Sequence, residues 1–532
     1  MNFNLLNEKW LPVFRQDGTR DWIAPHQVVE RENPPVAFAG RLPEYNSAYT
    51  QFMVGLIQTS CPPSDQDAHL EGYEDLPNPE DLQKAFAHYE EAFYLVHEDP
   101  NHPRFFQTPL HRVEDSSDDW VKPVSQLSHQ SGSVTITTDH NPIPYLDAVD
   151  LKEAAALLLS QQIEGSGGAG GYYTSLRCGG PITAILQSQI SLWKTLWLNV
   201  IPHTEMQTLH SETPDKGTSD KIFSWMREDL SGAWDKSSSF KAVSQGEVSP
   251  LFIFWSISKN IRLLIDDDLK VRHMLYTTSL RFVTKAGEGW RHPMTPYVPA
   301  NKSHPVRAQN ATVDFDLRDW VVASYSLGKQ NPLEYLPATL EIFEANSDLK
   351  EALADAGDTV TIRLTGPCYD SNQAKILGYM DRVFPILSNN RYENATLKSK
   401  ASALVSAYKK MEKCIKTGLY VVGLTYNDHA HFNKAINIWY EYESDIISAL
   451  YRWKASGTLQ EDDSVLEEIL NSVRDRFLVE YARLCGMRSD GRGRRRRDRN
   501  GNEISLLLKH DKLRKDLNKV IKSSLTLKEG NE

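Results

Sequence analysis

The chain has 532 residues, of which 40% are hydrophobic and 24% are charged, with a formal net charge of −11 at pH 7. This balance is typical of a globular protein of roughly two to four domains, and it excludes an intrinsically disordered chain. No apolar run is long enough to span a membrane, and residues 1–13 lack the pattern of a signal peptide. The five cysteines are scattered without a C-x-x-C pair, which argues against a disulfide framework or structural zinc and favours the cytoplasm.

Charge is divided unevenly along the chain. Residues 391–532 contain 27 Lys and Arg against 20 Asp and Glu, a balance of +7. The whole chain has 59 basic and 70 acidic residues, so residues 1–390 contain 32 and 50, a balance of −18. A basic carboxy-terminal part on an acidic body predicts that one end of the protein faces a polyanion.

The first 150 residues mix short strands with helices. Strand-like runs broken by turn residues occur within residues 1–23, and residues 45–59 have helical character. We expect a polar loop over 62–80, because it is rich in Pro, Asp and Glu, and a further helix over 82–95. Residues 100–150 show little regular period, which predicts long irregular loops of the kind that are often functional or disordered.

A glycine-rich stretch, Glu164 to Pro181, follows a segment that predicts a helix. Residues 151–163 read LKEAAALLLSQQI, rich in strong helix formers, and Asp150 is a plausible cap. Gly165 to Gly170 satisfies G-x-G-x-x-G, but the dinucleotide fingerprint requires a strand before it. The glycines therefore predict a loop. It is either a flexible connection or a loop whose bare backbone lies against a ligand, and we favour the second because the stretch continues into two tyrosines and a leucine.

The middle of the chain predicts a mainly β region. Residues 182–200 alternate as a long apolar helix or a pair of strands, and Trp290 to Ala300 is Pro-rich and extended. Asp266 to Asp268 reads as a turn between strands. The strands that we expect in this region lie at residues 251–257, 271–276, 280–283, 360–364 and 382–387.

From residue 391 the character changes to helical. Apolar residues recur at three-to-four spacing, and short links between such helices imply antiparallel neighbours. The four segments that we expect to be helical lie at residues 394–424, 430–456, 462–486 and 503–526. The predicted fold class is therefore α+β: a large mixed domain over 1–390 with irregular loops, followed by a four-helix bundle over 391–532.

No catalytic constellation emerges from the sequence. Asp428 to His431 suggests a metal, but it opens a predicted helix and has no third ligand nearby, so an N-terminal cap is the better interpretation. G-x-S-x-G, H-E-x-x-H and paired Cys/His patterns are absent. We therefore predict no catalytic residue, no metal and no cofactor.

A run of arginines separates the third and fourth predicted helices. One interpretation is a solvated loop, because blocks of like charge repel and stay extended. The other is contact with phosphates, in which each neutralised phosphate releases counterions. The residues of this run are Arg492, Arg494, Arg495, Arg496, Arg497 and Arg499.

Two further loops carry candidate residues. Lys302 follows the Pro-rich stretch, where a lone lysine is usually a surface charge. Asn372 and Gln373 follow a predicted strand and the turn-like Gly366-Pro367. Such amides either read base edges or part a duplex, although most serve as turn residues.

Taken together, these motifs resemble the CasA family, the large subunit of the type I-E CRISPR surveillance complex Cascade. The resemblance covers the whole chain in order, and the carboxy-terminal bundle agrees in place and size. The motifs that carry it are Asn4-Leu5-Leu6 with Trp10-Leu11-Pro12-Val13, the glycine loop with Leu176-Arg177-x-Gly179-x-Pro181-x-Thr183, Trp290-x-His292-Pro293-x-Thr295-Pro296, and Ser371-Asn372-Gln373-Ala374-x-Ile376-Leu377.

The resemblance implies a division of roles on duplex DNA. The backbone of Gly168, Ala169, Gly170 and Gly171 would lie against the minor groove of the protospacer-adjacent motif. Lys302 would reach into the same groove. Gln373, with Asn372 and Ala374 beside it, would insert as a wedge and part the first base pair.

The resemblance also implies partners and an absence of catalysis. The family recognises the motif, helps the guide RNA of the other Cascade subunits to open the duplex, and recruits a helicase-nuclease. Some members have a cysteine-rich zinc insertion, but this chain has no cysteine between 178 and 368, so zinc is not expected. A loop that meets the guide RNA's 5′ handle would fall at about residues 125–140, where no motif matches.

Two rival interpretations make different predictions. A nucleotide-dependent enzyme using the Gly165–Gly170 loop requires a strand before Gly165. A helical scaffold without a nucleic-acid role predicts that Lys302 and the arginine run can be neutralised without consequence.

Overall fold

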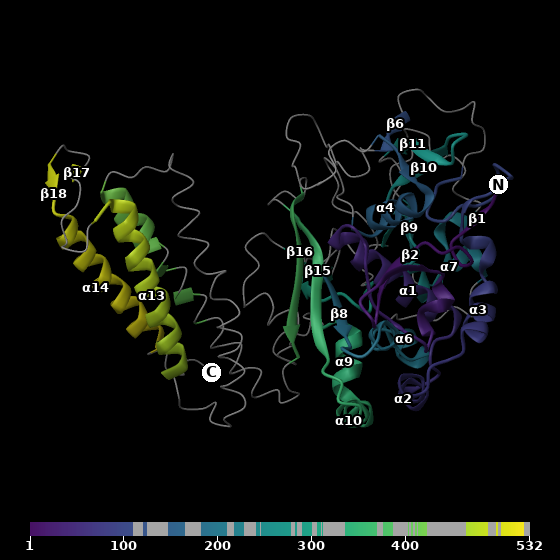
Figure 1. Cartoon of the computed structure of the whole chain (residues 1–532), viewed down its shortest axis with the longest axis horizontal. Helices are drawn as coiled ribbons and strands as arrows, with labels where there is room; N and C mark the ends of the chain where they lie inside the picture. The colour runs from purple at the N-terminus through teal and green to yellow at the C-terminus, as the bar shows by residue number, and fades with distance from the viewer. Residues whose placement is uncertain are drawn as a thin grey trace. The chain divides into compact units, whose positions relative to one another are not determined.

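The computed structural model divides the chain into two compact units (Figure 1). The first consists of Met1–Phe315 with Ala323–Leu387, and the second of Asp316–Val322 with Ser388–Glu532. The structure describes residues 1–109, 121–124, 147–164, 182–209, 218–227, 241–244, 246–277, 282–284, 290–299, 306–309, 311, 336–369, 376–386, 403, 406–407, 410–411, 413–422, 464–487, 496–497 and 502–525. Helices and sheets mix in the first unit and helices follow in the second, which confirms the predicted α+β class.

The core of the first unit is built around α1 (Pro43–Ser60), where a helix was expected. Of its 18 residues, 14 are buried, so it is covered on almost every side, as expected of a central helix. Phe52 lies at 5.1 Å from the Trp10 ring and 6.2 Å from that of Trp255, both nearly edge-on. Gly55 permits this packing, because a Cβ there would lie 3.0 Å from Trp255.

Small sheets surround this core. The strands at the amino terminus and in the 271–276 region occur as predicted, and Arg272 binds Asp266 and Asp268 across the β10–β11 turn. The sheets are β1 (Phe3–Asn4) with β5 (Tyr94–Val96); β3 (Arg20–Ile23), β2 (Leu11–Arg15) and β4 (Pro35–Phe38); β10 (Asn260–Ile265), β11 (Lys270–Thr277), β6 (Val121–Pro123) and β7 (Val149–Asp150); and β9 (Lys241–Val243) parallel to β12 (Phe282–Thr284).

One further sheet and one hairpin carry the segments predicted to act on DNA. β15 is the central strand of the sheet, with β8 on one side and β16 on the other, and it packs against α1. The strands are β8 (Thr183–Gln187), β15 (Thr361–Tyr369) and β16 (Ile376–Pro385), with the separate hairpin of β13 (Tyr297–Pro299) and β14 (Val306–Ala308).

The helices of the first unit include several that the sequence did not predict. α4 begins with Asp150 accepting a hydrogen bond from the Glu153 amide at 2.8 Å, which confirms the predicted cap. The described helices besides α1 are α2 (Gln66–Glu74), α3 (Pro79–Ala87), α4 (Leu151–Glu164), α5 (Leu192–Trp197), α6 (His203–Thr208), α7 (Ser219–Ile222), α9 (Ala338–Ala345) and α10 (Ser347–Asp355), with 3-10 turns at η1 (Pro25–Val29), η2 (Glu90–Ala92), η6 (Ser224–Met226) and η8 (Pro250–Ile253).

The predicted polar loop over 62–80 is wrong, because it contains α2 and the start of α3. Asp65 caps α2 by accepting a hydrogen bond from the Ala68 amide. Gly72 lies so close to Trp197 that a Cβ would be 2.3 Å from its ring. The helix over 82–95 also differs: α3 begins at Pro79 and ends at Ala87, and the chain continues as η2 and β5.

Three predictions for the β region need correction. Residues 182–200 form one strand and one short helix, because Ser191 caps α5 after β8 ends. The strand expected at 251–257 is a 3-10 turn, and the strand begins instead at Asn260. Gly366 and Pro367 lie inside β15 rather than in a turn.

The second unit brings together the helices predicted near the carboxy terminus. They are residues 413–421, α13 (Ser464–Cys485) and α14 (Leu506–Leu525), with a short pair of strands, β17 (Arg496–Arg497) and β18 (Glu503–Ile504). Gly418 lies against α13 and α14, since a Cβ there would be 3.2 Å from Tyr481 and 3.7 Å from Leu513. The expected helix over 430–456 and residues 428–431 lie outside the described residues.

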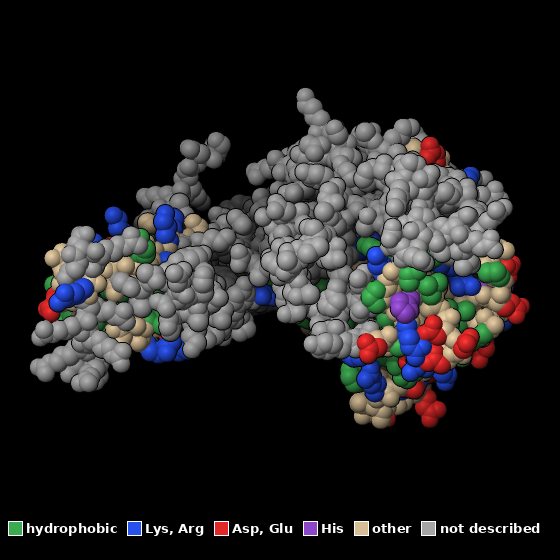
Figure 2. All heavy atoms as spheres, turned by 90° about the horizontal axis from the view of Figure 1, so that it is seen from above, with side chains coloured by type: hydrophobic (Ala, Val, Ile, Leu, Met, Phe, Trp, Pro, Cys, Tyr) green, Lys and Arg blue, Asp and Glu red, His purple; other side chains and the backbone are tan. Residues whose placement is uncertain are grey.

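Charged side chains gather on parts of the described surface. Figure 2 shows Lys and Arg side chains on the described face of the carboxy-terminal helices, whereas Asp and Glu gather on part of the first unit. Among the described helices, none is both long and apolar enough to cross a membrane.

Candidate nucleic-acid interface

Most residues predicted to contact DNA lie outside the described residues. This holds for Gly168 to Gly171, for Lys302, for Asn372 to Ala374, and for the arginines at 492, 494, 495 and 499. Their flanking elements are described in detail. The geometry of the candidate interface is therefore that of the elements from which these segments leave and to which they return.

The glycine stretch begins at a buried carboxylate. Glu164, the last residue of α4, is 4% exposed. It accepts hydrogen bonds from the Ser47 hydroxyl of α1 at 2.8 Å and from the Tyr379 hydroxyl of β16 at 3.1 Å. The Thr365 hydroxyl of β15 lies 2.9 Å from that of Ser47. The point at which the chain leaves α4 is thus tied to α1 and to two strands.

Burial also determines the protonation state of the Tyr379 hydroxyl, which donates to Glu164. It raises the pKa of the Tyr379 hydroxyl, and the nearby Glu164 carboxylate raises this pKa further. The phenol therefore stays protonated at neutral pH and keeps its hydrogen bond to Glu164. We call Ser47, Glu164, Thr365 and Tyr379 the Glu164 cluster.

A second anchor lies one half-turn earlier on α4. The Gln162 amide nitrogen donates to the Phe106 and Lys259 carbonyl oxygens at 2.9 Å. Its oxygen accepts from the backbone amides of Ser258 at 2.8 Å and of Lys259 at 3.0 Å. All of these groups are buried, where an unmade hydrogen bond costs about 1–3 kcal/mol, so the end of α4 is held firmly.

The glycine stretch ends, and the predicted wedge segment at residues 370–375 begins, at the same end of one sheet. β8 runs antiparallel to β15, with Thr183 opposite Thr365 and Gln187 opposite Thr361. β15 continues beyond Thr365 to Tyr369, which pairs with Ile376 of β16. The segments 165–181 and 370–375 therefore join the same end of one sheet.

The residues that flank the lysine segment, residues 300–305 around Lys302, form main-chain hydrogen bonds to β8 and to the residue before it. Pro299 of β13 is opposite Val306 of β14, so residues 300–305 connect the two strands of a hairpin. The Ile182 amide donates to the Gln309 carbonyl at 2.8 Å, and the Ala184 amide donates to the Met294 carbonyl at 2.7 Å. The hairpin is thus bonded to the residues at which the glycine stretch ends.

An ion pair joins the two strands of the β15–β16 hairpin beneath the predicted wedge segment. The Arg363 guanidinium donates two hydrogen bonds of 2.6 Å to the Asp381 carboxylate across β15 and β16. The bond to Asp381 raises the pKa of Arg363 despite its burial. A two-point bond of this kind restricts twisting of the strands beneath residues 370–375.

Sequence reasoning missed the residues of the scaffold itself. Glu164 was identified only as the start of the glycine stretch, and Ser47, Thr365 and Tyr379 were not singled out. Each hydrogen bond of the Glu164 cluster joins residues more than 100 positions apart, so no local pattern signals it.

The arginine run is described at two positions. Arg496 and Arg497 form β17, opposite Ile504 and Glu503 of β18, and Arg497 is exposed. This part of the run is therefore paired backbone next to the start of α14, with at least one guanidinium facing solvent.

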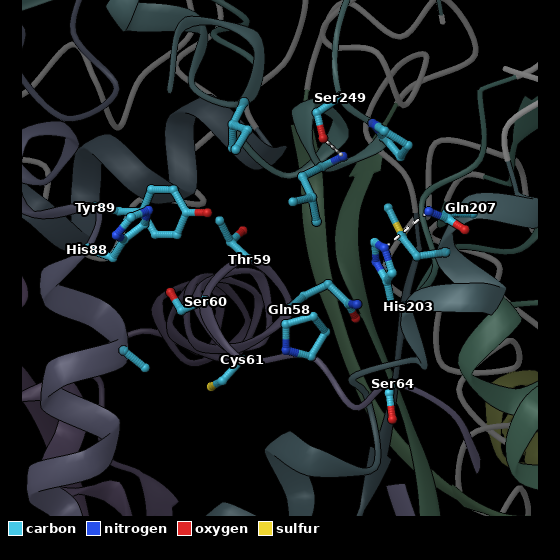
Figure 3. A pocket seen from close by; sticks show the side chains of 16 residues that line it. Gln58, Thr59, Ser60, Cys61, Ser64, His88, Tyr89, His203, Gln207 and Ser249 are labelled. Carbon is cyan, nitrogen blue, oxygen red and sulfur yellow. Dashed lines mark hydrogen bonds between the residues drawn. The ribbon is translucent and has the colours of Figure 1, made fainter. Parts of the chain in front are cut away.

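The first unit contains a cavity of about 1030 Å³ (Figure 3). Its described lining contains no Asp, Glu, Lys or Arg, and His88 and His203 face it from opposite sides. Burial raises the pKa of the Cys61 thiol there to about 12, so its thiolate is scarcely populated at neutral pH. A lining without Lys or Arg does not suit phosphate.

The structure removes the basis for the dinucleotide-binding interpretation. α4 ends at Glu164, directly before Gly165, so a helix precedes the G-x-G-x-x-G pattern. The fingerprint needs a strand there, because the phosphates bind where a strand turns into a helix.

Comparisons with known proteins agree with this architecture. The family model of CRISPR-associated protein Cse1 matches residues 4–478. The structure of CasA from Thermus thermophilus is similar, with a TM-score of 0.67 and 18% identity over 98% of this chain and 100% of that one. Cse1 from Acidimicrobium ferrooxidans gives 0.64 and 16% over 99% and 98% of the two chains.

A chain of a structure described as a CRISPR RNA-guided surveillance complex is also similar. Its TM-score is 0.59, with 14% identity over 91% of this chain and 98% of that one. No curated protein matches the chain. On the family match across most of its length, this chain belongs to the Cse1 family, the CasA-type large subunits that its motifs resemble.

Proposed function

We propose that this protein is the large subunit of an RNA-guided DNA surveillance complex and that it recognises the protospacer-adjacent motif in duplex DNA. In this role it promotes strand opening and recruits a helicase-nuclease. Membership of the Cse1 family supports the assignment, and so does the similarity to a chain of a CRISPR RNA-guided surveillance complex.

One observation carries the proposal beyond family membership. Three segments that are far apart in sequence, each with a motif expected to act on DNA, leave from one scaffold. The Ile182 amide bonds to the strand end after the lysine segment, and β8 pairs with the strand before the wedge segment. Three segments that start and end on one base can engage one short stretch of duplex together.

Each segment has a role that its chemistry suits. The backbone of Gly168 to Gly171 lies in the minor groove, and Lys302 reaches into the same groove, whose degenerate pattern tolerates several motif sequences. Gln373, between Asn372 and Ala374, enters the stack below the motif. Unstacking costs about a few kcal/mol, which pairing of the guide RNA with the target strand offsets.

The proposed role is not catalytic and needs no cofactor. The subunit acts in the cytoplasm within a complex of the other Cascade subunits and guide RNA, and a separate helicase-nuclease degrades the DNA. The arginines at 492, 494–497 and 499 contribute contacts to the DNA backbone.

Separating recognition from opening tests the proposal. Lys302→Ala weakens the first encounter with motif-bearing duplex, because the alanine side chain is too short to reach the minor groove. Gln373→Ala leaves much of that encounter intact and slows strand separation. A target with a few mismatched pairs beside the motif is already unstacked, so it rescues Gln373→Ala far more than Lys302→Ala.

The measurement is the rate of guide–target pairing in the assembled complex, followed by base-analogue fluorescence on closed and pre-opened duplexes. Lys9→Ala removes an exposed lysine away from the scaffold and serves as the control. Equal rescue of both variants, or of neither, contradicts the assigned roles.

A further inference from the structure

A cavity of about 430 Å³ lies among the helices of the second unit and has an unusual charge. Four lysines line it: Lys410 and Lys413, both in helical backbone that precedes α13, and Lys509 and Lys512 from α14. Asp516 is the one acidic side chain in its described lining. None of the four lysines has an ion-pair partner in the described part of the chain.

The floor of this cavity is apolar. Gly418 has no side chain, which leaves open the space above Leu513 and the Tyr481 ring; a Cβ there would be 3.7 Å and 3.2 Å from them. Val421 and Val520 also line the cavity. Cations on the rim and aliphatic groups below suit a ligand that is anionic on its flanks and apolar at its centre.

A buried tyrosine also lines the cavity. Tyr481 is 0% exposed and lines the cavity, and its hydroxyl lies beside the thiol of Cys485, which is only a weak acceptor. Burial raises the pKa of this phenol, so it remains a donor.

The lining favours a protein segment over nucleic acid. Single-stranded nucleic acid is usually held by aromatic faces on which bases stack, often with arginine. Here the lining has no arginine in the described residues, and its one described aromatic ring is fully buried. An aliphatic cleft between helices, flanked by charge, is the arrangement that accepts an amphipathic helix.

We propose that this lysine-rimmed cavity is the docking site for an acidic, amphipathic helix of a protein partner. One apolar side chain enters above Gly418, and carboxylates beside it meet Lys410, Lys413, Lys509 and Lys512. The proposal is independent of the DNA contacts proposed for the first unit, and it adds a protein-binding surface to the second.

A synthetic helix tests the site on the full chain. The probe is a fluorescein-labelled peptide with leucines on one face and glutamates on the rest, and its counterpart has glutamine in place of glutamate. Fluorescence anisotropy should show binding of the glutamate peptide, with about tenfold or more loss for the glutamine peptide. Lys413→Glu with Lys512→Glu should cause a similar loss, because attraction becomes repulsion.

Two further variants separate the cavity from overall charge. Arg514→Glu makes the same change of charge on α14 as Lys512→Glu alone, but at a residue outside the cavity lining, and should leave the affinity within about twofold. Thr417→Trp fills the mouth without changing charge and should abolish binding, with circular dichroism showing that the chain is folded. Equal effects of Lys512→Glu and Arg514→Glu overturn the proposal. So does tight binding of an oligothymidylate that the paired lysine change alone removes, since that identifies a nucleic-acid site.

Discussion

His69 shows how a single buried residue is restricted to one protonation state. It is 2% exposed, and its Nε2 lies 3.0 Å from the Trp197 carbonyl oxygen, to which it donates. Its Nδ1 is buried without a partner in the described part of the chain. Burial lowers the pKa of His69, and the Trp197 carbonyl offsets only part of this effect.

The pH dependence of stability follows from that direction. The unfolded chain takes up the proton near the ordinary pKa of about 6.5, whereas folded His69 takes it up only at lower pH. This contribution to stability is complete above about pH 6.5 and is lost as the pH falls towards the folded pKa, by up to about 1.4 kcal/mol per pH unit. The denaturant concentration at the unfolding midpoint of the first unit should therefore decrease as the pH is lowered below about 6.5.

A substitution isolates the part due to this residue. His69→Gln should lower stability at neutral pH, because the fit against Trp197 is lost. It should also make stability decrease less steeply as the pH falls below 6.5. His203→Gln changes an exposed histidine and serves as the reference substitution. An unchanged slope in His69→Gln would assign the acid sensitivity to other groups.

At the scale of elements, the base of the β15–β16 hairpin makes a prediction about stiffness. Arg363 and Asp381 are 26% and 23% exposed and share two hydrogen bonds. Arg363→Leu leaves a largely buried carboxylate without its partner, so the free energy of unfolding should fall by about 1–3 kcal/mol. Chemical denaturation measures it, and Arg363→Lys should recover only part, since one ammonium cannot bond at both points.

Val383 supplies the matched control for this hairpin. It is 53% exposed on β16, so Val383→Ala should change stability by less than about 0.5 kcal/mol. If Arg363→Leu lowered the free energy of unfolding as little as Val383→Ala does, the Arg363–Asp381 ion pair would contribute little to the stability of the hairpin.

Elements with a long, regular pattern were predictable from the sequence. α1, α4, α13 and α14 lie where helical spacing and caps placed them, because each presents several turns of apolar residues. α2 was missed, since its nine residues are mostly polar and only His69 and Tyr73 are buried.

The strand β15 shows how pairing overrides a local turn signal. Gly366 and Pro367 suggest a break, yet the ladder with β16 runs through both. β8 pairs with β15 only as far as Thr365, so the missing amide hydrogen of Pro367 removes no bond to β8. For the candidate site, the sequence indicated the loops but not their common base, whose contacts join distant parts of the chain.

At the scale of the whole molecule, the uneven charge predicts a salt effect. Changing Arg494 to Arg497 to Ser should lower non-specific DNA affinity of the assembled complex. It should also flatten the dependence of affinity on salt, by roughly 0.9 in logarithmic slope for each phosphate that is no longer neutralised. Binding isotherms at several salt concentrations measure this.

Lys519→Ser, a change of one exposed charge on α14, gives the baseline for a general loss of positive charge. A slope that stays at the value of the unchanged protein after the arginine substitutions would contradict contact between this run and DNA.

The Glu164 cluster has a consequence for the timing of synthesis. Tyr379 lies 215 residues after Glu164, and Thr365 lies 318 residues after Ser47. A ribosome adds about 5–20 residues per second, so Glu164 waits roughly 10–40 s for its last partner. During that interval the end of α4 and the glycine stretch have no sheet to join. The nascent first unit therefore completes its fold only after β16 has emerged, when more than two-thirds of the protein has been made.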